Sequence, residues 1–253
     1  HWPEIRNTRL SSIALTTIPS DEPGIKQSKI GHYPYLPLDA EYPRDAEGKW
    51  MFPLAQINFA ELPGLHGYPG SGYLQFYISG FDDVYGLDFD DPQSQENFRV
   101  LFFEERDITT PKTEFDFLQE VMSAEGVPVT QSKIFKFAHR EEYVGVGDFR
   151  HDDNQDWDLF RVVEQYPEME KQLQDALYDS FYYTGHKIGG YAAFSQHDPR
   201  MNDPRFAEYI LLFQLEAEEG ITWGDSGIAN FFIHPDDLAK KDFSKVLYNW
   251  DCF

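Results

Sequence analysis

Cysteine and positive charge are the two features that this sequence has least of. The single cysteine, Cys252, allows no disulfide within the chain, so an oxidising compartment is not implied. Lys and Arg together number 21 against 44 Asp and Glu, which gives a formal net charge of −23. Because so acidic a surface repels phosphate groups, we expect no nucleic acid and no membrane surface as partners. The acidity then serves solubility alone or attracts a basic protein.

Long apolar runs are also missing. No segment approaches the roughly 20 apolar residues that a membrane-spanning helix needs. Residues 1–20 lack the apolar core of a signal peptide. Together with the single cysteine, these absences predict a cytoplasmic location.

Patterns that bind metals or phosphates are absent as well. The eight histidines are dispersed, without a His-x-His or His-Glu-x-x-His pair. The acidic run 152–158 has the spacing of a calcium loop, but Trp157 stands at its sixth position and Val163 at its twelfth, where glycine and glutamate are required. The glycine-rich run 67–72 precedes a strand and lacks the lysine of a phosphate loop. We therefore expect no metal and no cofactor.

The run Gly224-Asp225-Ser226-Gly227 is similar to the turn that carries the nucleophile of some serine proteases. A catalytic triad also needs a positioned histidine base and an orienting carboxylate, and the surroundings show neither. We expect instead a turn that leads into a buried strand, with the Asp225 side chain bonded to neighbouring amides. Neither a serine hydrolase nor a metalloenzyme is predicted, and the sequence leaves open whether there is any catalytic activity.

Aromatic and apolar residues are abundant. Aromatics make up 17% of the 253 residues and hydrophobic residues 41%, which excludes disorder and favours pleated sheets. The length suits one compact body, and we treat residues 1–253 as a single domain. Runs of β-prone residues predict strands at 12–18, 51–59, 73–78, 98–103 and 134–138.

The main helix is predicted in the middle of the chain, between residues 159 and 181. Apolar residues recur there at steps of three and four, with Pro167 expected to divide the helix and Gly185 to end it. The residues of this stripe are Leu159, Val162, Val163, Tyr166, Met169, Leu173, Leu177 and Phe181.

The chain also contains ordered matches between its two ends. Residues 29, 31, 33 and 56 match residues 187, 189, 191 and 214, each 158 positions apart, and both sets read Lys, Gly, Tyr and Gln. Residues 71, 72, 76 and 78 match residues 226, 227, 231 and 233 at a separation of 155. Matches in one order predict an internal repeat. The predicted fold is mainly β (α+β), with duplicated antiparallel units at 27–103 and 186–253 and a helix-containing insertion at 104–185.

Gln56 and Gln214 are the most informative polar pair, because each interrupts an apolar run. An unpaired amide buried there would cost roughly 1 to 3 kcal/mol, so each must have partners. A side-chain amide can donate and accept, and it can therefore clamp the backbone of a turn such as Lys-Ile-Gly against the strand. We favour this clamp over contact with a ligand, since the residue occurs twice.

The combination of motifs resembles the YwqG-like bacterial family, the DUF1963 domain. The resemblance covers residues 27 to the C-terminal end and departs from the family pattern at His32 and Ala192. It implies a cytoplasmic, mainly β, duplicated fold and an association with bacterial toxin and immunity genes, but no catalytic residues. The motifs are Ser28-Lys29-Ile30-Gly31, Leu54–Asn58, Gly189-Gly190-Tyr191 with Gln196, and Trp223–Gly227 with Phe231–Ile233.

These features favour a module that binds another protein, as an immunity-type or other interaction partner. The acidic loops Asp82 to Asp91 and Asp152 to Asp158 are expected to attract a basic partner. The alternative is a small-molecule binding protein or enzyme that holds an anionic ligand between the two units; a third reading places both lysines on solvated faces. The candidate ligand or partner residues are Lys29, Gln56, Lys187, Gln214, Trp223 and Asp225.

Overall fold

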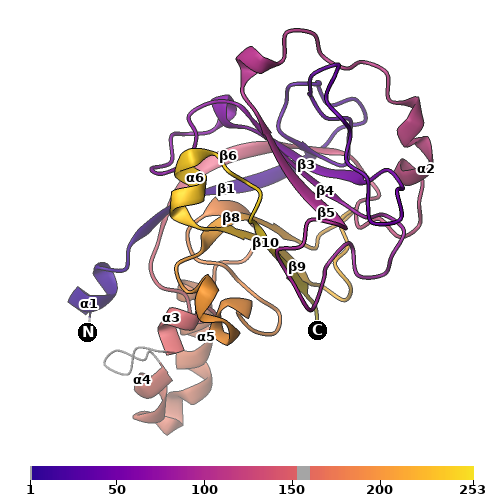
Figure 1. The fold of residues 1–253 in the computed structure, drawn as a ribbon. Helices are drawn as coiled ribbons and strands as arrows, with labels where there is room; N and C mark the ends of the chain where they lie inside the picture. Colours follow the sequence, from indigo (N-terminus) through magenta and orange to yellow (C-terminus); the bar gives the residue numbers. More distant parts are fainter. Residues whose placement is uncertain (1, 153–159) are drawn as a thin grey trace.

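The computed structural model describes residues 2–152 and 160–253, and its strands form one ten-stranded sheet (Figure 1). All neighbouring strands in this sheet are antiparallel, so the mainly β, antiparallel prediction is confirmed. The strands are β1 (Leu10–Pro19), β2 (Lys29–Ile30), β3 (Phe52–Asn58), β4 (Tyr73–Ile78), β5 (Phe98–Phe103), β6 (Lys133–Glu142), β7 (His186–Gly189), β8 (Ile210–Glu216), β9 (Ile228–Ile233) and β10 (Leu247–Asp251). The helices are α1 (Trp2–Arg6), α2 (Gln119–Met122), α3 (Phe149–Asp152), α4 (Phe160–Glu164), α5 (Glu170–Phe181) and α6 (Pro235–Lys240).

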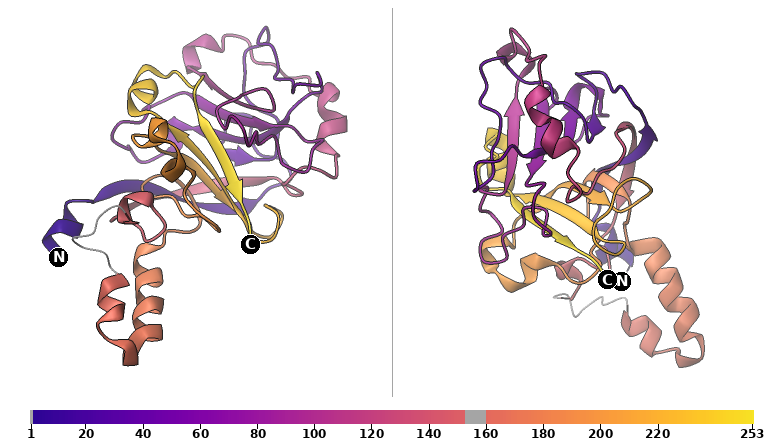
Figure 2. Two further views of the ribbon diagram at one scale, coloured as in Figure 1. Left: turned by 60° about the horizontal axis from the view of Figure 1, so that its bottom comes forward. Right: turned by 90° about the vertical axis from the view of Figure 1, so that its right-hand side faces the viewer.

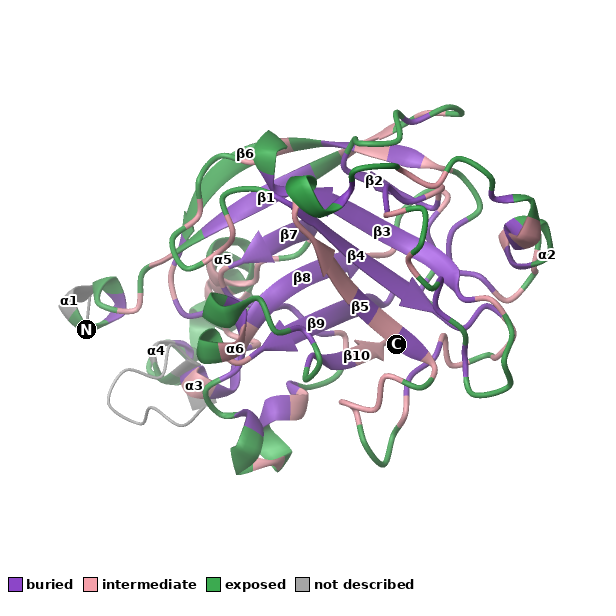
Figure 3. Cartoon of the chain, turned by 45° about the horizontal axis from the view of Figure 1, so that its top comes forward, coloured by how far each residue is buried: buried purple, intermediate pink, exposed green. Residues whose placement is uncertain are grey.

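The strand order is β10-β9-β8-β7-β1-β6-β2-β3-β4-β5. The long strands β1 and β6 lie at the centre, and four strands flank each of them (Figure 3). The two flanks correspond in register, because Lys29 lies opposite Gln56 on one side and Lys187 lies opposite Gln214 on the other. The glutamines that match in sequence therefore occupy equivalent strands.

Strand β6 lies inside the segment 104–185 that was expected to be an insertion. It pairs with β1 over ten residues, from Leu10 opposite Glu142 to Pro19 opposite Lys133. The segment therefore supplies a central strand of the sheet as well as helices. Buried and exposed residues both occur from 134 to 138, as the alternation of apolar and basic residues predicts for a half-exposed strand.

The sheet curls so that its two flanks meet face to face across an aromatic core. The Phe76 ring of β4 lies 4.9 Å from Phe213 of β8 and 4.7 Å from Phe231 of β9, between ring centroids. Phe98 of β5 lies 5.1 Å from Tyr248 of β10. All five side chains are fully buried. Removal of apolar surface from water is the dominant favourable term in folding, and these rings bury large areas of it.

The predicted helix divides at Pro167, as expected, into α4 and α5 with a 3-10 turn between them. It ends at Phe181, four residues before Gly185, because Tyr182 already has an extended backbone. No side chain of α5 is buried, and α4 and α5 project from the body (Figure 2). Leu159, at the start of the predicted stripe, lies outside the described residues. In the described chain, no helix is both long and apolar enough to cross a membrane.

Substitution of Gly31 tests the tight turn that follows β2. Its φ is +65°, and an added Cβ would lie 2.6 Å from Val129 Cγ1. Gly48 also has a positive φ, +78°, but an added Cβ there meets nothing within 4 Å. Gly48→Ala should therefore cost only the left-handed conformation, about 1 to 2 kcal/mol. Gly31→Ala should exceed that cost by at least about 1 kcal/mol in urea unfolding. Equal costs for the two variants would contradict the tight turn.

Candidate functional site

Gln56 clamps three backbone groups of the loops that flank β2. Its Oε1 accepts a hydrogen bond from the Tyr35 amide at 2.7 Å, and its Nε2 donates to the carbonyl oxygens of Ile25 and Gln27, both at 3.0 Å. The side chain is 2% exposed. These bonds are those of the predicted backbone clamp, but they hold the residues on either side of Lys29-Ile30-Gly31 and not that turn itself.

Gln214 forms the same clamp in the other flank. Its Oε1 accepts from the Ala193 amide at 2.8 Å, and its Nε2 donates to the carbonyls of Tyr183 at 3.1 Å and Gly185 at 2.8 Å. Each of these partners lies 158 positions after its counterpart in the first clamp. Both amides are therefore saturated by the protein's own backbone.

A second amide completes each clamp, and the sequence analysis missed it. Gln75 Nε2 donates to the Tyr35 carbonyl at 2.6 Å, and Asn230 Nδ2 donates to the Ala193 carbonyl at 2.9 Å. The signal was present, since Gln75 and Asn230 lie 155 positions apart, the offset already found for their neighbours. Tyr77 donates its hydroxyl to Gln75 Oε1, whereas the residue 155 positions later is a phenylalanine without a hydroxyl. Asn230 Oδ1 accordingly has no partner among the described residues.

The two candidate lysines are both buried, so neither lies on a solvated face. Lys29 is 1% exposed, and its Nζ donates to the carbonyls of Gly24 at 2.9 Å and Ile25 at 2.8 Å. Burial lowers the pKa of Lys29 to about 7. Burial also lowers the pKa of Lys187 to about 8, although the Glu142 carboxylate opposes this shift. Each Nζ is bound by two oxygen atoms of the protein itself, since Lys187 donates to Glu142 Oε2 and to the Tyr191 carbonyl.

Glu142, at the end of β6, binds Lys187 and two further groups. Its Oε2 lies 3.0 Å from Lys187 Nζ and accepts from the Tyr191 amide at 2.8 Å, while its Oε1 accepts from the Ser12 hydroxyl at 2.7 Å. Gly190 makes room for this carboxylate, since a Cβ there would lie 2.2 Å from Oε2. The buried ion pair is thus fully hydrogen-bonded, the condition under which a buried charge is tolerated.

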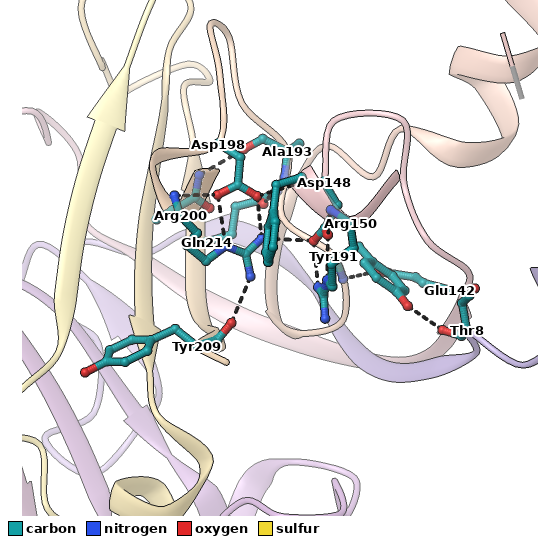
Figure 4. Close-up of polar contacts among 12 residues, drawn as sticks. Thr8, Glu142, Asp148, Arg150, Tyr191, Ala193, Asp198, Arg200, Tyr209 and Gln214 are labelled. Atoms are coloured by element: carbon teal, nitrogen blue, oxygen red, sulfur yellow. Dashed lines mark hydrogen bonds and ion pairs between the residues drawn. The ribbon is translucent and has the colours of Figure 1, made fainter. Parts of the chain in front are cut away.

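A second buried ion network lies beside it (Figure 4). Asp148 accepts two hydrogen bonds from the Arg150 guanidinium, both at 2.6 Å, and one from Arg200 Nη2 at 2.9 Å. Arg200 in turn bonds Asp198 through Nε at 2.9 Å and Nη2 at 2.6 Å. Burial opposes ionisation of Asp148, but the Arg150 hydrogen bonds and the Arg200 charge hold its pKa below the usual value.

This network joins the segment after β6 to the connection between β7 and β8. Asp198 Oδ2 accepts from the Phe149 amide at 3.2 Å, and Arg200 Nη1 donates to the Tyr209 carbonyl at 2.9 Å. Two carboxylates meet two guanidinium groups, so the cluster is neutral as a whole. The sequence signal that was missed is a repeated Asp-x-Arg, at 148–150 and at 198–200. The side chains of this cluster have hydrogen-bond partners within it, which indicates that the cluster holds the two segments together.

Trp223 and Asp225 lie in one turn but in different environments. Trp223 is fully buried and packs edge-on against Tyr85, with ring centroids 5.3 Å apart. Asp225 is exposed, and its side chain forms no hydrogen bond with the described residues, so the expected bonds to neighbouring amides are wrong. The Gly227 amide donates to the Trp223 carbonyl at 2.8 Å, and this turn leads into the buried strand β9, as predicted.

Several hollows open on the surface of the described chain, and none of the six candidate residues lines them. Two of these hollows bear on function. The acidic groove, of about 490 Å³, lies between residues 80–83 and 120–126. The β6 groove, of about 460 Å³, lies between residues 27–28, 61–63 and 134–137. Within residues 2–152 and 160–253, no group of three or more His, Cys, Asp or Glu side chains is arranged to hold a metal ion.

The fold and these contacts define a class of protein. It is mainly β, it is built on one curled antiparallel sheet, and its candidate Gln and Lys side chains are buried and hydrogen-bonded within the protein. Residues 28–252 match the family described as Domain of unknown function (DUF1963), and the chain belongs to this family. The resemblance drawn from the sequence motifs is confirmed to that extent. No curated protein matches the chain.

The clamp predicts a large loss of stability for Gln214→Leu. The substitution leaves the Ala193 amide and two carbonyls without their side-chain partner, at roughly 1 to 3 kcal/mol for each buried group. We expect a loss of at least about 3 kcal/mol in chemical unfolding, and a similar loss for Gln56→Leu. The control Gln172→Leu, at an exposed position of α5, should change stability by no more than about 0.5 kcal/mol. A loss no larger than the control's would refute the clamp.

The lowered pKa of Lys29 predicts that the free energy of unfolding rises with pH. Its pKa is about 7 in the folded protein against 10.5 ordinarily, so between pH 7 and 9.5 the unfolded chain binds more protons and the folded state gains as pH rises. Lys29→Met should remove up to about 1.4 kcal/mol per pH unit from the slope of the unfolding free energy. The exposed Lys26→Met should leave that slope unchanged. Parallel pH profiles for wild type and Lys29→Met would show that Lys29 is not neutralised by burial.

Proposed function

We propose that this protein is a binding module that recognises a basic segment of another protein in its acidic groove. The observation that carries this proposal is the lining of the groove, in which four carboxylates surround an apolar patch. The carboxylates belong to Asp82, Asp83, Glu120 and Glu125, and the patch to Gly80, Phe81, Ala124 and Gly126. Such a site suits Lys or Arg, whose aliphatic stems pack on apolar surface while their charged ends meet carboxylates.

The charges in this groove are available to a partner. None of the four carboxylates forms an ion pair with a lysine or arginine of the described chain. Lys49 lies 4.8 Å from the Phe81 ring centroid, but its Nζ pairs with Glu47 at 2.9 Å. Asp82 is held in place, because its Oδ1 accepts from the amides of Val84 and Gly86. A net charge of −23 would steer a basic partner toward this surface.

The competing reading, a pocket for an anionic small molecule between the two flanks, has less support. Lys29 and Lys187 are buried and bonded to backbone carbonyls, and Lys187 also to Glu142. The second acidic loop, Asp152 to Asp158, lies outside the described residues after Asp152 and adds nothing to either reading. The proposed binding function therefore rests on the acidic groove alone.

We also propose that the chain is an internal duplication whose units are β1–β5 and β6–β10. The equivalent registers and the equivalent amide clamps support it. On this proposal the units exchange their first strands, since β1 pairs with β7 and β6 pairs with β2. The exchange moves the unit boundaries from 27–103 and 186–253 to about 10–103 and 133–251. We further propose that the chain belongs to the YwqG-like bacterial branch of the family and that it is cytoplasmic.

The groove is tested with the triple variant Asp83→Asn, Glu120→Gln, Glu125→Gln and a labelled oligo-lysine peptide. Exposed ion pairs contribute about 0.2 to 1 kcal/mol each, so we expect anisotropy titrations to show binding weakened by about tenfold. The control Glu22→Gln, Asp39→Asn, Glu41→Gln removes the same charge at exposed positions elsewhere and should weaken binding by less than about twofold. Equal weakening in both variants would assign the attraction to net charge and reject the groove.

A further inference from the structure

Strand β6 is paired along its whole length on one side and for only two residues on the other. All ten of its residues lie opposite β1. On the opposite side, β2 pairs only with Lys133 and Ile134, and one further bond runs from the Phe135 amide to the Ser28 carbonyl at 3.2 Å. Beyond Phe135, residue 136 and residues 138–141 are exposed and Phe137 is half-buried (Figure 3). A strand at the centre of the sheet therefore has a free edge over half its length.

The register identifies the backbone groups at this edge. Successive residues of a strand direct their N–H and C=O groups to opposite sides. Because Phe135 bonds toward β2, the residues that direct their backbone to the same side are Phe137, His139 and Glu141. Their amides donate to no acceptor within residues 2–152 and 160–253. Three donors and three acceptors at strand spacing form a template for one more strand.

The β6 groove lies at the inner end of this edge. Phe135, Phe137, Leu62 and Pro63 belong to the apolar part of its lining, and Gln27, Ser28, Glu61 and Lys136 form the polar part. An added strand would run in line with β2 and antiparallel to β6. Side chains on its Phe137 face would contact this apolar lining.

The other face of the edge is basic on an otherwise acidic protein. Lys136 and Arg140 are exposed, and both lie on the face opposite Phe137, since side chains alternate along a strand. Neither forms an ion pair with a described residue, whereas Glu141 is paired with Arg9 at 3.2 Å. Cross-strand neighbours of opposite charge stabilise a pair of strands, so this face fits acidic side chains.

We propose that the β6 edge from Phe137 to Glu141 binds an extended segment of another protein by strand addition, and that this segment alternates apolar and acidic residues. Its apolar side chains enter the β6 groove, and its acidic side chains pair with Lys136 and Arg140. This surface is separate from the acidic groove, so either proposal can fail without the other.

The probe is a labelled peptide, Val-Glu-Val-Thr-Val-Glu, with Val-Lys-Val-Thr-Val-Lys as its charge-reversed counterpart. The first readout is amide hydrogen exchange of the whole protein. The amides of residues 137, 139 and 141 should exchange quickly in the free protein and become protected by about tenfold or more with the acidic peptide. The amides of residues 136, 138 and 140 face β1 and should be protected in both states. Saturating peptide without protection at 137, 139 and 141 overturns the proposal.

Two variants test the two kinds of contact. His139→Pro removes an outward donor without removing a donor to β1, and it should weaken peptide binding by about tenfold, while His139→Ala should leave binding within about twofold. The pair Lys136→Glu, Arg140→Glu should lose the acidic peptide and gain the lysine peptide. Circular dichroism checks that His139→Pro is folded, and if it is not, the exchange pattern of the wild type decides.

Other outcomes count against the proposal. Sensitivity to Lys136→Glu, Arg140→Glu without sensitivity to His139→Pro would mean charge attraction alone. A dimer in sedimentation, with residues 137, 139 and 141 already protected in the absence of peptide, would mean that a second copy of the chain covers the edge.

Discussion

The antiparallel pairing of β1 with β6 is the interaction on which the rest of the structure depends. These ten-residue strands connect two four-stranded flanks that otherwise meet only through side chains and loops. Because β1 also pairs with β7 and β6 with β2, neither flank can form its full set of backbone bonds without the other half of the chain. The pairing is long-range in sequence, which predicts slow, cooperative folding of one body and not of two independent halves.

Buried polar side chains supply backbone hydrogen bonds that the strands do not form. The loops that flank β2 and β7 have no neighbouring strand to satisfy their backbone, and the paired amides supply those hydrogen bonds. The two flanks differ in how they hold their buried lysine, since Lys187 has Glu142 beside it and Lys29 has only carbonyl oxygens. Burial lowers the pKa of both lysines, and in each case a nearby carboxylate opposes the shift, Glu61 at Lys29 and Glu142 at Lys187.

Because hydrogen bonds within the protein occupy the buried Gln and Lys side chains, both of our binding proposals rest on surface features. These features are the acidic groove and the free edge of β6, which have opposite local charge. The first presents carboxylates without ion-pair partners among the described residues, and the second presents backbone groups beside two cations. On the two proposals together, the protein holds two segments of one partner or of two partners, and each contact responds to salt in its own way.

The sequence by itself determined the local pattern: the β-prone runs, the division of the helix at Pro167, the turn before β9, the glutamine clamp and the family. Alternation, glycine and proline positions and a buried amide's need for partners are local properties, so they can be read from neighbouring residues. It did not determine that residues 104–185 supply a central strand, that the Lys29 and Lys187 side chains are buried, or that Asp148, Asp198, Arg150 and Arg200 meet. Only the tertiary structure decided these, because β6 pairs with strands more than a hundred positions away and Asp148 and Arg200 lie 52 positions apart. A polar side chain is free or saturated according to what the fold places beside it.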